Sequence, residues 1–159
     1  MPEFRGRLRP IGRVAILVSQ YNERVTSRLL EGALECCHSA GILPGEVDVV
    51  WLPGAFELGG AAAAAAASGR YVAIVALGCV VRGETAHFEY VAGEAARGLS
   101  EVAVRYRLPV GFGILTTDTI EQALARAGGP AGNKGHEAAE AALRTADVLA
   151  RLGGVDAPA

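Results

Sequence analysis

A hydroxyl, an imidazole and a small residue lie close together in one short segment, at Thr85, His87 and Gly83. An apolar run at 71–77 comes before it, typical of a strand buried on both faces, and a helix-like pattern of apolar residues follows. Residues 82–87 are therefore predicted to form a strand-to-helix turn, which in a parallel sheet lies where ligands bind. Free N–H groups at the helix start favour an anion such as phosphate. The alternative is that Thr85 only caps the helix and His87 lies on the surface.

Other predicted strand ends carry side chains that suit a flat, polar ring. Tyr21 and Asn22 follow the first apolar run, Phe56 and Glu57 follow the second, and Phe112 lies within the fourth. Two aromatic side chains can sandwich a heterocycle, worth about 1 kcal/mol beyond burial. Glu57 can accept hydrogen bonds from ring N–H groups. We therefore expect a heterocycle site, although Phe56 and Phe112 taken singly would also suit a core.

Two basic residues, Arg126 and Lys134, flank a glycine-rich segment at 128–132 and can neutralise a phosphate from a second direction. Taken singly, each is a solvated helix end. Together with the ring-binding residues they predict a site for a flat ring and a phosphate, with His87 transferring protons near neutral pH. The sequence has no G-x-G-x-x-G after its first strand, no P-loop and no G-x-S-x-G segment, so those three kinds of site are disfavoured.

Alternating strands and helices must position these residues. The alternation indicates a parallel sheet covered on both faces. The predicted fold class is therefore α/β: a three-layer α/β/α sandwich with a four-stranded parallel sheet, flavodoxin-like in outline. We expect one domain at 14–152, an N-terminal arm at 1–13 and a C-terminal tail at 153–159. Strands are predicted at 14–19, 47–52, 71–77 and 110–115, helices at 25–40, 55–69, 88–106, 120–126 and 134–151, and a loop at 128–132.

Composition argues against several other classes of protein. Of 159 residues, 51% are hydrophobic and 20% are charged, as in globular proteins, and the net charge of −2 does not indicate nucleic-acid binding. No signal peptide or membrane span is expected. Three cysteines, an odd number, indicate reduced thiols and a cytoplasmic protein, and the three histidines lack the spacing of metal ligands. The basic amino end is interpreted as a solvated tail or as an arm that lies on a neighbour; its arginines are Arg5, Arg7, Arg9 and Arg13.

Four motifs in a fixed order resemble those of one known family. They are PGAFE at 53–57, GCVVRGETAHFEY at 78–90, GILTTDTIEQA at 113–123, and RAG at 126–128 with GNKG at 132–135. Over about residues 14–152 the chain is similar to the lumazine synthases. This resemblance implies a transferase that condenses 5-amino-6-(D-ribitylamino)uracil with 3,4-dihydroxy-2-butanone 4-phosphate to 6,7-dimethyl-8-ribityllumazine, the penultimate step of riboflavin biosynthesis. It implies no metal and no organic cofactor.

The resemblance also implies roles for individual residues. His87 corresponds to the acid-base residue, Tyr21 to an aromatic residue that stacks on the pyrimidine, and Phe112 and Lys134 to positions that a neighbouring subunit contributes. The residues implied in binding the uracil and its ribityl chain are Tyr21, Asn22, Ala55, Phe56, Glu57, Gly78, Val80, Val81, Phe112 and Lys134. Those implied in binding phosphate are Gly83, Glu84, Thr85, Ala86 and Arg126.

Two residues of the phosphate turn depart from the family pattern. Ala86 stands where the family often has a hydroxyl residue, so one phosphate contact is expected to be missing. Glu84 adds a negative charge beside the phosphate. An inward Glu84 would weaken phosphate binding, whereas an outward one would only favour the helix dipole.

The resemblance further implies assembly. Family members form pentamers, and some form icosahedral shells of twelve pentamers. We expect a homo-oligomer built of pentamers, with small-molecule substrates and neither nucleic acid nor a membrane as partner; the short segment at 128–133 resembles that of the shell-forming members. Two alternatives are an archaeal-type riboflavin synthase, which joins two lumazines, and a shell-forming scaffold with a weak site.

Overall fold

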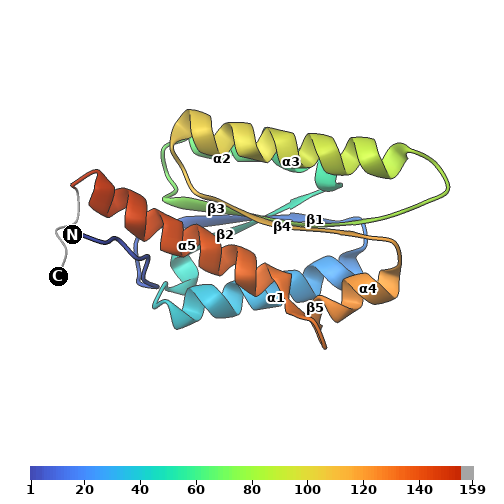
Figure 1. Cartoon of the computed structure of the whole chain (residues 1–159), viewed down its shortest axis with the longest axis horizontal. Coiled ribbons are helices and arrows are strands. Elements are labelled where there is room, and N and C mark those ends of the chain that lie inside the picture. The colour runs from blue at the N-terminus through green and yellow to red at the C-terminus, as the bar shows by residue number, and fades with distance from the viewer. Residues whose placement is uncertain (155–159) are drawn as a thin grey trace.

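Four parallel strands form one sheet in the order β2-β1-β3-β4 (Figure 1). The computed structural model describes residues 1–154 of the chain, so most of the predicted tail, 155–159, lies outside the described residues. This strand order is that of a flavodoxin-like sheet without its fifth strand. The predicted four-stranded parallel sheet is confirmed. The strands are β1 (Val14–Ser19), β2 (Val47–Leu52), β3 (Ala73–Val81) and β4 (Val110–Thr117).

Helices cover both faces of the sheet and complete the three layers seen in Figure 1. One face carries α2 and α3, and the other carries α1, α4 and α5. The predicted α/β/α sandwich is therefore confirmed. The helices are α1 (Glu23–Ser39), α2 (Leu58–Ala67), α3 (His87–Tyr106), α4 (Ile120–Ala125) and α5 (Lys134–Leu152). The shorter elements are η1 (Pro44–Glu46), η2 (Ala55–Glu57), β5 (Ala127–Gly129) and β6 (Gly132–Asn133).

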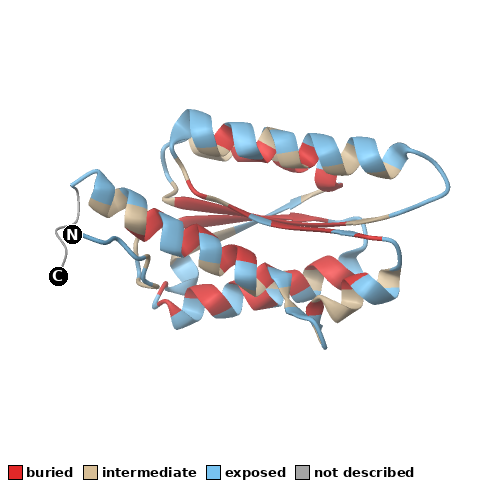
Figure 2. Ribbon diagram, in the orientation of Figure 1, coloured by how far each residue is buried: buried red, intermediate tan, exposed pale blue. Residues whose placement is uncertain are grey.

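The central strands are buried over most of their length, whereas the edge strands are partly exposed (Figure 2). Every residue of β1 is buried, whereas all six residues of β2 are half-buried or exposed. On the other edge strand, β4, five of the eight residues are buried, and Phe112 and Thr116 are exposed. Strands packed between two helical layers need apolar side chains on both faces, and the continuous apolar runs of β1 and β3 supply them. The two edges therefore remain open to further contacts.

Several predicted boundaries differ from the structure by one to three residues; the helix predicted at 55–69, for example, is η2 followed by α2. Two segments differ more. β3 continues to Val81, beyond the predicted end at residue 77, because its pairing with β4 continues until Val81 lies opposite Thr117. The segment predicted as a loop at 128–132 is part of the antiparallel hairpin β5–β6. Gly128 and Gly132 adopt left-handed conformations there, with φ of 97° and 85°, which glycine adopts without strain. A sequence rich in glycine gives no periodic signal, so the hairpin was not visible in it.

The N-terminal arm contacts α5 of its own chain through a buried carboxylate. Asp147, whose side chain has no exposed surface, accepts hydrogen bonds from the Arg7 N–H at 2.9 Å, from Arg9 Nε at 2.5 Å and from Arg151 at 3.0 Å. Burial raises the pKa of Asp147, but the bonds from Arg9 and from the Arg7 backbone outweigh it and hold the pKa below its ordinary value. Part of the basic character of the amino end therefore has an acidic partner within the chain.

We expect Asp147→Ala to lower the melting temperature by roughly 5–10 °C. Removing one partner of a buried ion pair costs about 3 kcal/mol or more, and each 1 kcal/mol shifts the melting temperature of a domain this size by roughly 2–4 °C. Because the native pKa of Asp147 is below the unfolded value, its stabilisation is complete above about pH 4 and is lost as the pH falls through the native pKa. Calorimetry at neutral and acidic pH should show the difference between wild type and variant shrinking in acid.

The matched control for this prediction is Glu101→Ala, which removes an exposed ion pair with Arg97. Solvent screens exposed pairs and they contribute little to stability, so this variant should shift the melting temperature by less than about 3 °C. Equal shifts for the two variants would contradict a structural role of the buried Asp147 cluster.

The three cysteines are buried free thiols, Cys36, Cys37 and Cys79. Burial raises the pKa of each to about 11, so thiolate is scarce at neutral pH and the side chains act as small apolar groups. Within residues 1–154, no cluster of three or more His, Cys, Asp or Glu side chains has the arrangement of a metal site. None of the helices described is both long and apolar enough to cross a bilayer.

Candidate active site

A cavity of about 440 Å³ opens where β1, β2 and β3 end. Tyr21 is 71% exposed and Phe56 is 59% exposed, so the interpretation of Phe56 as a core residue is wrong. Exposed aromatic rings beside a cavity suit stacking on a flat ligand. The residues that line the cavity are Tyr21, Gly54, Ala55, Phe56, Glu57, His87, Tyr90 and Val91.

Asn22 fixes the turn that presents Tyr21 to this cavity. It adopts the left-handed conformation, with φ of 59°, which asparagine tolerates better than most residues. Its Nδ2 donates to the carbonyl of Cys79 on β3 at 3.0 Å, and the Tyr21 N–H donates to the carbonyl of Pro53 at 3.0 Å. A Cβ at Gly54 would come within 2.8 Å of the Tyr21 ring, so Gly54 leaves the space that the ring occupies. The Asn22 amide is thus used for a contact within the chain.

Glu57 closes the short helix η2 at the edge of the cavity. Its Oε2 accepts a hydrogen bond from the Gly54 N–H at 3.0 Å. This bond fixes the orientation of the carboxylate. Because a carboxylate can accept several hydrogen bonds, Glu57 can still accept one from a ring N–H.

The turn expected to bind phosphate is exposed along its length. Residues 82–86 lie outside helices and strands, and α3 begins at His87. The Thr85 hydroxyl accepts a long hydrogen bond, 3.4 Å, from the His87 N–H. Glu84 and Ala86, the two departures from the family pattern, are both exposed. An exposed turn that leads into a 20-residue helix is a suitable position for an anion.

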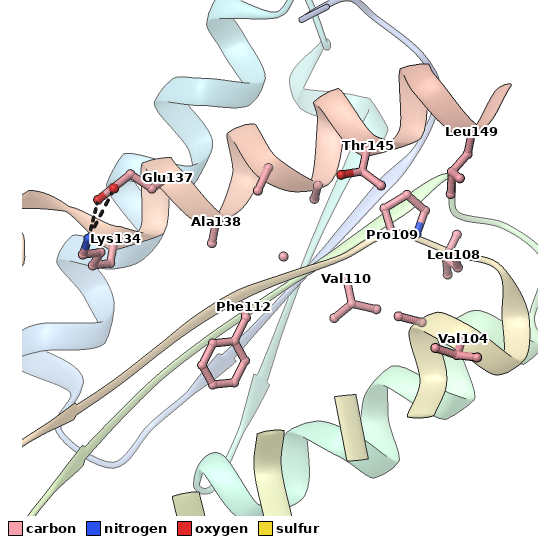
Figure 3. Close-up of a pocket in the computed structure, with 14 residues that line it drawn as sticks. Val104, Leu108, Pro109, Val110, Phe112, Lys134, Glu137, Ala138, Thr145 and Leu149 are labelled. Atoms are coloured by element: carbon pink, nitrogen blue, oxygen red, sulfur yellow. Dashed lines mark hydrogen bonds and ion pairs between the residues drawn. The ribbon is translucent and has the colours of Figure 1, made fainter. Parts of the chain in front are cut away.

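Phe112, Arg126 and Lys134 line a second cavity, of about 290 Å³, beside the edge strand β4. Phe112 is 50% exposed, so it is not a core residue either. The β5–β6 hairpin brings the two cations together, because the Lys134 N–H donates to the Arg126 carbonyl at 2.9 Å. Arg126 Nη1 donates to the Gln122 carbonyl at 2.9 Å, and Lys134 Nζ lies 3.2 Å from Glu137 Oε2 (Figure 3). Both contacts are exposed, so a ligand anion can compete for these cations.

The residues on either side of Lys134 hold it in place. Asn133 Oδ1 accepts hydrogen bonds from two N–H groups in the first turn of α5, at 2.8 and 3.1 Å, and so caps this helix. Asn133 Nδ2 donates to the Arg28 carbonyl of α1 at 3.0 Å. Gly135 packs directly on α1, where a Cβ would overlap the Leu29 carbonyl. The start of α5 is therefore tied to α1, which fixes the position of Lys134.

The two cavities are separate in one chain. Among residues 1–154 their linings have no residue in common. The first is bounded by η2 and α3, and the second by β4 and the residues at the end of α4 and the start of α5. His87 begins α3 on one face of the sheet, and Arg126 follows α4 on the opposite face (Figure 1), so the two residues line different cavities.

Comparison with known proteins identifies the family. The family model described as 6,7-dimethyl-8-ribityllumazine synthase matches residues 12–150. A protein of Edwardsiella ictaluri (strain 93-146) named 6,7-dimethyl-8-ribityllumazine synthase is 54% identical over 141 residues, which cover 88% of this chain and 90% of that protein. The chain belongs to the 6,7-dimethyl-8-ribityllumazine synthase family. The resemblance found in the sequence motifs is thereby confirmed.

Three residues that the lumazine synthase pattern implies in ring binding belong to β3. Gly78 is buried, and a Cβ there would meet Leu58 and Ser19 at 3.3 Å. Val80 and Val81 are half-buried at the end of the strand. Within residues 1–154, none of these three positions is among the residues that line the first cavity. Their roles in a lumazine synthase site remain predictions.

Tyr90, Val91 and Gly54 line the first cavity but were missed in the sequence. Tyr90 is 73% exposed and lies three residues after His87 on α3, so both point from one side of the helix. Helical spacing from His87 could have indicated Tyr90. Val91 belongs to the helix-like pattern of apolar residues that follows the turn, and it is half-buried, packing on the core and lining the cavity.

Proposed function

We infer that the chain catalyses the condensation of 5-amino-6-(D-ribitylamino)uracil with 3,4-dihydroxy-2-butanone 4-phosphate to 6,7-dimethyl-8-ribityllumazine, the penultimate step of riboflavin biosynthesis. The observation that carries the inference is the cavity of about 440 Å³ in which two exposed aromatic rings, a carboxylate and an imidazole come together. Membership of the family supports the same transferase reaction.

Each residue type fits a step of this reaction. An amine of the uracil attacks the ketone and water leaves as the imine forms. Phosphate is then eliminated to give an enol that becomes a carbonyl, and the second amine attacks this carbonyl and closes the ring with loss of a second water. Tyr21 and Phe56 stack on the uracil, and Glu57 accepts a hydrogen bond from it. His87 transfers protons, and Arg126 binds the phosphate. The steps need proton transfers but no electron transfer, and much of the acceleration comes from holding the two reactants together.

An absorbance assay tests the proposed reaction. The purified chain with both substrates should form 6,7-dimethyl-8-ribityllumazine, and either substrate alone should give none. The chain supplied with the lumazine alone should form no riboflavin, in contrast to an archaeal-type riboflavin synthase. Riboflavin formation from lumazine, or no lumazine from the substrate pair, would overturn the proposal. Neither the family match nor the relative supports the riboflavin synthase or scaffold alternatives.

We also propose that neighbouring chains of a homo-oligomer share each site. Support comes from the separation of the His87 and Arg126 cavities within one chain. A largely apolar groove of about 530 Å³ runs between α3, β4 and α5 and includes Phe112 and Lys134 (Figure 3). Val104, at 79% exposure, and Leu149, at 39%, add apolar surface to it. Apolar surface beside an unpaired edge strand favours contact with another chain.

Pentamers, free or in shells of twelve, are the proposed assembly. The shortness of the β5–β6 hairpin favours the shell, by resemblance. Light scattering should give about five times the chain mass of 16.4 kDa for a pentamer, and about sixty times the chain mass for a shell of twelve pentamers. A fully active species of 16.4 kDa would exclude a shared site.

Three further proposals concern the setting of the enzyme. We propose that residues 14–152 act as one unit, with residues 1–13 as an arm. The partners proposed are small-molecule substrates and further copies of the chain, and the compartment proposed is the cytoplasm. Three buried free cysteines support a reducing compartment.

Arg126→Ala should raise the KM for the butanone phosphate by about 10- to 100-fold, because a charge-assisted hydrogen bond to phosphate contributes about 1.5–3 kcal/mol. The KM for the uracil should change by less than about threefold, because the variant removes no contact with that substrate. Steady-state kinetics with each substrate varied in turn measures both constants. Arg97→Ala, an exposed arginine of α3, is the control and should alter neither. Equal losses for the two substrates would argue against phosphate binding by Arg126.

A further inference from the structure

Arg82, the first residue of the exposed turn, contacts three side chains. Its Nε donates to Asp118 Oδ1 at 2.9 Å, its Nη1 lies 3.4 Å from Glu89 Oε1, and its Cζ is 4.5 Å from the centroid of the Phe88 ring. Its N–H donates to the Thr117 carbonyl at 2.8 Å and so extends the pairing of β3 with β4. One guanidinium therefore connects the start of the turn, the first turn of α3 and the end of β4.

These contacts connect the residues on the two sides of the segment 83–86. Arg82 comes immediately before residues 83–86, and its partners Phe88 and Glu89 come after them. His87 and Thr85 lie between Arg82 and Phe88, and the hydrogen bond between them is long, at 3.4 Å. A bond of that length restrains the turn weakly. The Arg82 contacts are therefore well placed to decide which conformation the turn adopts.

Asp118 is itself firmly placed at the start of α4. Its N–H donates to Gln122 Oε1 at 2.9 Å. The same oxygen accepts from the Thr119 N–H at 3.2 Å, and the Gln122 N–H donates to Thr119 Oγ1 at 3.2 Å, so Thr119 and Gln122 form a capping box. The Gln122 carbonyl accepts from Arg126 Nη1 at 2.9 Å. Arg82 thus links the turn beside the first cavity to the short helix that presents Arg126 at the second.

We propose that Arg82 is a positioning residue for the phosphate-binding turn. It holds residues 83–86 and the first turn of α3 in one conformation relative to α4, and it touches no reacting atom. The proposal rests on the function inferred above, because only then does the turn meet a substrate phosphate.

The exposure of these side chains defines what Arg82 can contribute. Arg82, Asp118 and Glu89 are 47%, 70% and 65% exposed. Solvent screens exposed ion pairs and they contribute little to stability, so loss of Arg82 should leave the melting temperature nearly unchanged. A planar guanidinium can meet a carboxylate and stack on a ring at once, which lysine cannot reproduce. The consequence of losing Arg82 is therefore local, in the geometry of the turn.

Hydrogen exchange in the ligand-free assembly tests whether Arg82 holds residues 83–86 in one conformation. Arg82→Gln should speed amide exchange in a peptide covering 83–92 while shifting the melting temperature by less than about 3 °C. Arg97→Gln is the matched control, since Arg97 of α3 also pairs with two exposed carboxylates, Glu94 and Glu101, at 2.8 and 2.5 Å. It should leave exchange at 83–92 unchanged. Unaltered exchange in Arg82→Gln would overturn the positioning role, whatever reaction the enzyme catalyses.

Kinetics separates positioning from direct phosphate binding. Arg82→Gln and Asp118→Asn should each raise the KM for the butanone phosphate by about tenfold, with the KM for the uracil nearly unchanged. The double variant should be no worse than either single one, because the two residues act through one contact. Arg82→Lys, which keeps the charge, should still lose most of the affinity.

Other outcomes of these kinetic measurements would contradict the positioning role. If Arg82 bound the phosphate itself, Asp118→Asn would release the guanidinium and leave the KM unchanged or lower it, which would overturn the proposal. Full rescue by Arg82→Lys would also overturn it. A wild-type chain that makes no lumazine would refute the proposed function instead, and the exchange measurement would still decide whether Arg82 holds the turn.

Discussion

Replacing His87 by alanine is expected to lower kcat by up to about 100-fold, the low end for loss of a general acid-base group. The low end applies because the two substrates can condense without a specialised catalyst once they are held together. His87 lies at the start of α3 and on the wall of the cavity that contains Tyr21 and Phe56, so the variant removes the imidazole but not the aromatic rings.

Single-turnover and steady-state absorbance assays with both substrates saturating measure this effect. His38→Ala is the control, because His38 is exposed in the last turn of α1, away from both cavities, and should leave kcat unchanged. The KM values should change less than kcat in His87→Ala if the imidazole acts on the chemical steps. A turnover number equal to that of wild type would remove His87 from the mechanism.

Mixing two defective chains should restore activity if each site is shared between neighbours. One chain carries His87→Ala, the other carries Arg126→Ala, and the two are co-assembled in equal amounts. A site is whole where the chain that supplies the first cavity has kept His87 and its neighbour has kept Arg126. Random head-to-tail assembly gives this pairing at about one site in four. Activity at low butanone phosphate concentration should therefore approach about a quarter of that of wild type.

A second mixture provides the matched control. Tyr21 and His87 line the same cavity of one chain, so co-assembly of Tyr21→Ala with His87→Ala should restore nothing. Tandem purification on two different tags establishes that both chains are present in each assembly. If the His87→Ala and Arg126→Ala mixture also stays at the parental level despite proven mixing, both residues serve a site within one chain, and the shared-site proposal is wrong.

The sequence alone was sufficient to predict the fold class. The continuous apolar runs that became β1 and β3, and the helical spacing of α1 and α5, are local patterns that burial between layers imposes directly. The order of the sequence motifs also pointed to the family, which the family match over residues 12–150 confirms. The hairpin at β5–β6 was not predictable, because its glycines carry no side-chain pattern.

Only the tertiary structure decided how the candidate residues are grouped. In the sequence, Phe56 and Phe112 suit a core as well as a ligand platform, and their exposures of 59% and 50% exclude the core. The sequence likewise gathers His87, Arg126 and Lys134 into a single hypothetical site. In the fold, the crossovers place α3 and α5 on opposite faces of the sheet, so the cation pair and the imidazole line different cavities.

Only the tertiary structure also decided which polar side chains have partners within the chain. Asn22 and Glu57 were expected to bind a ligand, yet Asn22 donates to the Cys79 carbonyl and Glu57 accepts from the Gly54 N–H; Arg82, which was given no role, pairs with Asp118. Apart from Glu57 with Gly54, these partners lie 57 and 36 residues away along the chain. Hydrophobic periodicity records which side of an element is buried but not which distant element meets it. The packing of the strand ends against one another therefore decides which polar groups hold the site in shape and which remain open to substrate.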